Sequence, residues 1–86
     1  MQLIAHMKVR DYNAWRRAFD DDAESRGNAG MTLLQLWRQA DDENVVWMLY
    51  EVSERAMADG YLEGLGQLHA EQYGASEAGH VFVRTA

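Results

Sequence analysis

The residues of this sequence best suited to acid–base chemistry are His6, in a strand-like run over residues 2–9, and Glu51, near the end of another such run. A neutral imidazole in a partly apolar cavity can take or give a proton near neutral pH. Glu51 would lie on a neighbouring strand if the strand order is 4-1-3-2, where it would orient His6 or have its own pKa raised by burial. The structural alternative is a buried histidine bonded to Glu51 or to a backbone carbonyl, or a Glu51 that pairs with an arginine at an interface. We expect His6 and Glu51 to be the catalytic residues.

Two tryptophans supply flat apolar surface close to this pair. Trp47 and Trp37 could form a wall on which an aromatic or polyketide-like ligand stacks, or they could belong to the core of a dimer or of the helix packing. A one-residue slip in the hairpin that carries them exchanges the faces of the sheet, so either Trp37 or Arg38 shares a face with Trp47. We expect Arg38 on that face, where it would meet Glu51 or a ligand carboxylate.

A strand and a helix at the start of the chain must position His6. Residues 2–9 alternate between one wholly apolar face and one mixed face, which indicates a strand on a core. Asp11 is placed to cap a helix by accepting a bond from an amide of the first turn. The helix should end near residues 26–27, with Asn28 and Gly30 available for positive φ. Its apolar residues recur three to four positions apart: Tyr12, Trp15, Phe19 and Ala23.

The rest of the chain predicts a hairpin of two strands, a second helix opened by Ser53 and Glu54, and a last strand. Each glycine in residues 60–66 costs about 1 kcal/mol relative to alanine inside a helix, which predicts a break before residues 67–73. The inward positions of this helix are expected at Met57, Tyr61, Leu62, Leu65 and Leu68. The hairpin is predicted to have a strand at residues 31–39, a turn at 41–44 and a second strand at 45–52. The last strand is predicted at residues 80–84.

The resulting order βαββαβ is that of a ferredoxin-like domain, an α+β fold with an antiparallel four-stranded sheet and helices on one face, here one domain over residues 1–86. The face without helices should be polar unless another body covers it, and we predict it to be largely apolar. A chain of this size buries only about 60–65 % of its unfolded surface and has no cysteine to crosslink it. We therefore expect a homodimer that covers this face. Its predicted residues are Ile4, His6, Val45, Trp47, Leu49 and Glu51.

Composition narrows the classes of function. The formal charge is −6, with eight basic residues scattered among fourteen acidic ones, which argues against nucleic acid and anionic membrane surfaces as partners. No apolar run approaches eighteen residues, and we expect a soluble, cytoplasmic protein. The three histidines form no close pair, and the acidic run 20–22 lacks the pattern of a calcium loop, so no metal is expected. Neither a phosphate loop nor a dinucleotide motif is present, and we expect no cofactor.

Residues 3–60 contain a pattern that resembles the small bacterial members of the dimeric α/β-barrel superfamily, near the antibiotic-biosynthesis-monooxygenase-like and cyclase-like proteins. The resemblance implies ferredoxin-like protomers whose sheets face each other in a homodimer, with a cavity for a small apolar ligand. It specifies fold more closely than chemistry, because the superfamily includes cofactor-free oxygenases, haem-degrading enzymes, lactone isomerases and decarboxylases. The residues that carry it are 6–15, Phe19–Asp20, Arg26, Gly30, Trp37–Arg38, 41–46 and Glu51–Val52.

Tyr61 and His69, in the second helical region, lie loosely at positions where the haem-degrading members of the superfamily carry functional residues. His69 follows Tyr61 by eight residues, loosely where those enzymes place an iron-binding histidine after an aromatic residue. They carry tryptophan in place of Tyr61 and asparagine in place of His6, so the resemblance does not extend to haem. We treat Tyr61 and His69 as candidate ligand contacts only.

The leading hypothesis is a pocket enzyme that acts on an apolar, aromatic or polyketide-like compound by proton transfer or cofactor-free oxygenation. In this hypothesis His6 transfers the proton, and Glu51 orients the His6 ring. Tyr12 and Trp47 shape the cavity, and Arg38 balances negative charge on the ligand. The alternative is a non-catalytic dimeric binding or structural module whose polar groups only satisfy one another. An empty apolar cavity of about 300 Å³ or more near His6 would favour the ligand.

Overall fold

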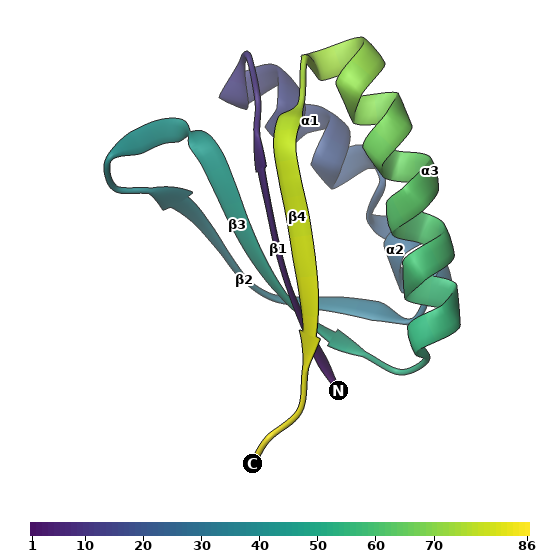
Figure 1. Ribbon diagram of the computed structural model, residues 1–86. Coiled ribbons are helices and arrows are strands. Elements are labelled where there is room, and N and C mark those ends of the chain that lie inside the picture. The colour runs from purple at the N-terminus through teal and green to yellow at the C-terminus, as the bar shows by residue number, and fades with distance from the viewer.

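The computed structural model describes the backbone of residues 1–86 and the side chains of residues 1–64, 72 and 74–86. A four-stranded antiparallel sheet with the order β2-β3-β1-β4 forms one layer, and the helices all lie against one of its faces (Figure 1). This confirms the predicted α+β class, the ferredoxin-like arrangement and the strand order. The elements are β1 (Gln2–Lys8), α1 (Tyr12–Asp21), α2 (Ala23–Asn28), β2 (Met31–Gln39), β3 (Asp42–Val52), α3 (Arg55–Tyr73) and β4 (Ser76–Val83).

The core lies between the two central strands and the helices. Burial of each large side chain in it contributes about 1.5–3 kcal/mol to folding. Because neighbouring residues of a strand point to opposite faces, this burial also fixes which residues face away from the helices. The predicted apolar faces are confirmed, with Leu3, Ala5, Met7 and Val9 in and after β1 and Val46, Met48, Tyr50 and Val52 on β3 packed against Trp15, Phe19 and Ala58.

The first helical region is capped and turned much as the sequence predicts. The Asp11 carboxylate accepts a hydrogen bond from the Ala14 amide at 3.2 Å. A break at Asp22 divides the region into α1 and α2, so the prediction of one helix that ends near residues 26–27 is wrong, because the backbone of Asp22 leaves the helical conformation. Ala23, predicted on the apolar side of that helix, is exposed. Gly30 has a φ of +72°, whereas Asn28 is the last residue of α2 and not a left-handed one. Gly30 thereby lets the chain turn into β2, and its carbonyl accepts a bond from the Ser53 amide at 3.0 Å.

The second helix differs from the prediction. α3 runs from Arg55 to Tyr73 without a break, so the expected interruption before residues 67–73 is wrong. The penalty of each glycine is local, whereas a break would leave several backbone groups without helical bonds. Ala58 is fully buried and Tyr61 and Leu62 pack against the core, whereas Met57 is 44 % exposed and does not point inward. The predicted inward positions Leu65 and Leu68 lie outside the described side chains.

Both hairpin strands and the last strand begin or pair irregularly. β3 starts at Asp42, so most of the polar run predicted as the turn forms part of the strand. The Asp42 carboxylate makes an ion pair with the Lys8 amino group at 3.2 Å. β4 starts at Ser76, four residues before the predicted position, because Ala78 and Gly79 are too small to show a strand alternation. Register shifts interrupt the pairing of β4 with β1 near Glu77, which has a φ of +50°, and that of β2 with β3 near Leu34.

No helix within the described part of the chain is long and apolar enough to cross a membrane.

Replacing Gly30 by alanine should destabilise the fold by about 1–3 kcal/mol, because a side chain there is strained at positive φ and would overlap Ser53 Oγ. The matched control is Gly27→Ala in α2, where the added methyl group meets nothing within 4 Å and should be neutral or stabilising by up to about 1 kcal/mol. Urea unfolding measures both variants. Equal free energies of unfolding for the two would contradict this account of the turn.

Candidate functional site

His6 lies on the face of the sheet that the helices leave open. It is paired with Trp47 on β3 and Gly79 on β4, and its ring stacks on the Trp47 indole with centroids 4.6 Å apart and planes at 29°. The Trp47 Nε1 donates a hydrogen bond to Gln39 Oε1 at 3.0 Å, which holds the indole in place. A Cβ atom on Gly79 would come within 2.8 Å of His6 Nε2. The absence of a side chain at Gly79 therefore provides the space that the imidazole occupies.

The structure does not bring Glu51 to His6. Glu51 pairs with Gln2, four residues along β1 from His6, which corresponds to about 13 Å along an extended strand. Its carboxylate accepts a hydrogen bond from Gln2 Nε2 at 2.7 Å and lies 3.4 Å from the Met1 amino group. The Gln2 hydrogen bond, supported by the amino group, holds the pKa of Glu51 below its ordinary value. Glu51 is thus an exposed anion with its own partners and is too far away to orient His6.

Trp37 and Arg38 take the faces opposite to those we expected. Arg38 pairs with Val46, which is buried against the helices, so Arg38 lies on the helical side of the sheet. Trp37 pairs with Trp47 on the open face and is 45 % exposed. The expectation that Arg38 would meet Glu51 is therefore wrong. The physical cause is a register shift between Arg38 and Gln39. Continuous pairing from Gln39 opposite Asp42 would place Arg38 on the face of Trp47, whereas the shift moves the pairing by three residues and places Trp37 there.

Tyr12 and Arg38 meet on the helical side of the sheet. The Arg38 guanidinium carbon lies 3.9 Å from the centre of the Tyr12 ring, and Arg38 Nε donates to the Glu43 carbonyl at 2.8 Å. Arg16 Nη1 donates to the Tyr12 hydroxyl at 3.4 Å, and its Nε pairs with Asp20 at 3.0 Å. The predicted ligand contacts are consequently divided between two faces, with Trp47 on one and Tyr12 and Arg38 on the other.

Tyr61 holds α3 to the junction of α1 and α2. Its hydroxyl donates a hydrogen bond to Asp22 Oδ2, and burial followed by this bond raises the pKa of Tyr61. Arg26 is 6 % exposed, donates from Nη1 to the Phe19 carbonyl at 2.6 Å and covers the Phe19 ring at 3.6 Å. The hydrogen bond to Asp22 gives Tyr61 a structural role between the helices, and Arg26 stabilises the same junction. The other candidate on this helix, His69, lies outside the described side chains.

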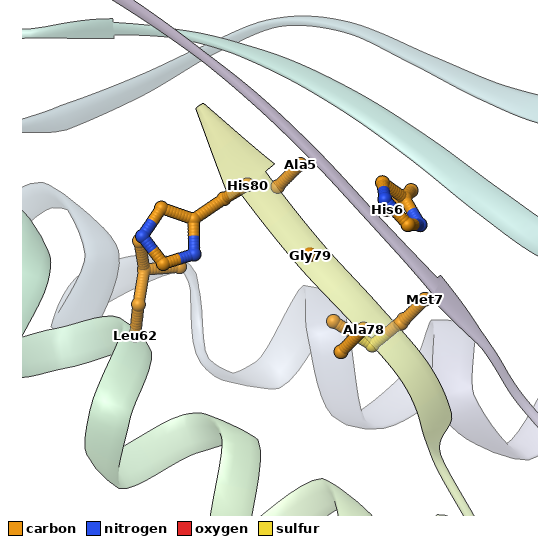
Figure 2. Close-up of a pocket in the computed structure, with 7 residues that line it drawn as sticks. All are labelled: Ala5, His6, Met7, Leu62, Ala78, Gly79 and His80. Carbon is orange, nitrogen blue, oxygen red and sulfur yellow. The ribbon is translucent and has the colours of Figure 1, made fainter. Parts of the chain in front are cut away.

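A small apolar pocket of about 100 Å³ lies beside β1 and β4, on the side of α3. Figure 2 shows Leu62 and His80 on one side of these strands and the His6 ring on the other. His6 and Gly79 complete the lining, so both faces of the strand pair contribute to its wall. The residues that line it are Ala5, His6, Met7, Leu62, Ala78, Gly79 and His80.

His80 is a residue that the sequence analysis missed. Its Nε2 lies 3.8 Å from the Asp59 Oδ1 of α3, and its ring meets the edge of Phe82 with centroids 5.7 Å apart. An imidazole beside a carboxylate and an apolar pocket is an arrangement that can transfer a proton. The strand alternation separates His80 from Val81, but the pairing of His80 with Ala5 of β1 is what places it on the helical face.

A metal centre has no support among the described side chains, where no group of three or more histidines and carboxylates comes together.

Tyr50 lies in the core near Arg26 and Asp22, and burial raises its pKa to about 12 from an ordinary value of 10.0. The unfolded chain therefore releases this proton before the folded chain does, so stability is unaffected below pH 10 and falls between pH 10 and 12. The two-unit difference corresponds to a loss of about 2–3 kcal/mol. Tyr50→Phe should make the fall in urea-measured stability across this range shallower. Parallel pH profiles for the variant and the unmodified protein would show that Tyr50 does not titrate in this way.

No known family model matches the chain, and no curated protein is significantly similar to it.

Proposed function

We propose that the protein is a homodimer that binds a small apolar compound in the pocket beside α3 and moves a proton on it. The observation that carries this proposal is the apolar pocket with the His80 imidazole in its wall and the Asp59 carboxylate 3.8 Å from that imidazole. The resemblance to the dimeric α/β-barrel superfamily supports both the dimer and the pocket.

The open face of the sheet supports the dimer. Its apolar side chains come from all four strands and include tryptophan side chains that are only partly buried. A second copy would bury this face against an identical one, as two-fold dimers do. The face consists mainly of Ile4, His6, Trp37, Val45, Trp47, Leu49, Val81 and Val83.

The volume of the pocket limits the ligand. About 100 Å³ is below the volume of about 300 Å³ that we expected to favour a ligand, so the volume by itself favours the non-catalytic module. A ligand that does enter can be no larger than a single ring or a short branched chain. A polyketide-like compound of several fused rings exceeds it. We therefore narrow the hypothesis from the sequence to a monocyclic aromatic or branched aliphatic compound.

The proton-transfer group is assigned to His80 within this proposal. His80 lies on the same side as the pocket, and Asp59 would orient its ring once their 3.8 Å separation shortens to hydrogen-bond distance. His6 was the expected group, but its ring stacks on Trp47 on the open face and Glu51 is paired elsewhere. In the dimer His6 would lie at the interface.

The alternative function is a non-catalytic dimeric module. The stacking of His6 on Trp47 favours it, because this contact and the Trp47–Gln39 hydrogen bond give these polar groups protein partners without a ligand. The two functions share the dimer and differ in whether the pocket is occupied.

Leu49→Lys should convert the dimer to a monomer, because it places a charge on the central strand β3, within the apolar interface. Analytical ultracentrifugation should find the unmodified protein at twice the chain mass of 9.8 kDa and the variant at that mass. Asn13→Lys on the exposed side of α1 is the control and should remain dimeric. A monomeric unmodified protein, or a dimeric Leu49→Lys variant, would contradict the proposed interface.

Native mass spectrometry of protein purified from its own host should find an additional small mass that leaves on denaturation. Ala78→Leu should remove this mass by filling the pocket, whereas Val81→Leu, two strand positions beyond Gly79 on the open face, should retain it. His80→Gln should keep the compound but slow its proton exchange with deuterated water at least tenfold, and His6→Gln should not. A dimer without additional mass would favour the non-catalytic module.

A further inference from the structure

A second cavity, of about 330 Å³, lies where α3 begins and β4 ends. Figure 1 shows the start of α3, the end of β4 and the N-terminus at the same end of the molecule. Arg55 and Arg84 supply cationic side chains to this cavity, and Phe82 and Val83 supply apolar ones. Met1 completes the lining, which is distinct from that of the pocket at His80.

Arg55 is held in place while most of its hydrogen-bond donors remain available. Its guanidinium carbon lies 4.5 Å from the centre of the Phe82 ring, which fixes the plane of the group. Its contact with Asp59 is made through Nε at 3.8 Å, between two exposed side chains, and is therefore weak. The two terminal nitrogens of the guanidinium can still donate to a ligand.

Arg84 is a second donor group in the lining of the cavity. It follows β4 directly, and among the described residues no carboxylate lies within ion-pair distance of it. Lys8, Arg16 and Arg38, by contrast, each contact a carboxylate of their own. In a chain with a formal charge of −6, a cavity with two arginine side chains is a local reversal of charge.

We propose that this cavity binds a small carboxylate with an apolar or aromatic body. The planar guanidinium groups match the two oxygens of a carboxylate, and Phe82 and Val83 form the smaller, apolar part of a mainly polar lining, against which the rest of the molecule can lie. The volume is at the lower end of small-molecule sites and is large enough for a single substituted ring. Val83 also belongs to the open face, whereas Arg55 and Phe82 lie on the helical side, and the lining does not include His80.

The test is a titration of the whole protein with sodium benzoate, followed by nuclear magnetic resonance of the backbone amides and arginine side chains. Saturable shifts should appear at Arg55 and at residues 82–84. Arg84→Gln and Arg55→Gln should each weaken binding by about tenfold or more, the effect of losing a charge-assisted hydrogen bond. Arg17→Gln, which removes an exposed arginine of α1 that does not line the cavity, should change the affinity less than twofold.

Two further probes define the chemistry of the ligand. Benzyl alcohol, a neutral analogue of benzoate, should bind at least tenfold more weakly, and equal binding would overturn the role of the arginines. Phenyl phosphate should bind no more than tenfold more tightly than benzoate, and a larger preference would overturn the assignment to carboxylates. The proposal also fails if benzoate produces no saturable shift or if Arg17→Gln weakens binding as much as Arg84→Gln. Urea unfolding of each variant confirms that the fold is retained.

Discussion

The register of β1 between β3 and β4 is the constraint on which the rest of the structure depends. It places Leu3 beside Tyr50 in the core and, one residue later on the other face, Ile4 beside Leu49. A shift of one residue would turn the apolar core face outward, at a cost that the small sheet could not recover. The same register sets His6 against Trp47 and separates it from Glu51. Core packing therefore decides which polar groups can work together.

The sequence predicted best where periodicity and end signals agree. The alternation of residues 2–9, the Asp11 cap and Gly30 located β1, α1 and the turn into β2, because each is a local property of a few neighbouring residues. The faces of Trp37 and Arg38 could not be predicted, because they depend on a register shift between Arg38 and Gln39 that no residue pattern announces. The continuity of α3 was also missed, because burial of residues such as Ala58 against the sheet outweighs the glycine penalties.

The candidate site was predictable only in part. The strand alternation placed His6 and Trp47 together on the open face, and the register confirms that they are neighbours. The approach of His80 to Asp59 joins residues of different elements, α3 and β4, and no local pattern reports it. Which of the two histidines lies beside a carboxylate of α3 is thus a result of topology. Fold class was accessible from the pattern of the residues, whereas the pairing of chemical groups was not.

The irregular pairing of β2 and β4 affects how molecules of this protein can associate. These two strands form the edges of the sheet, and each carries an extra residue, Leu34 in β2 and a bulge at Glu77 in β4. A bulged edge does not present the straight row of amide and carbonyl groups that another strand needs for pairing. Continuous strand addition, the route to fibrils, is thereby hindered at both edges. In the proposed dimer, by contrast, each molecule uses its open face once, so that assembly would be complete with two copies and would not grow.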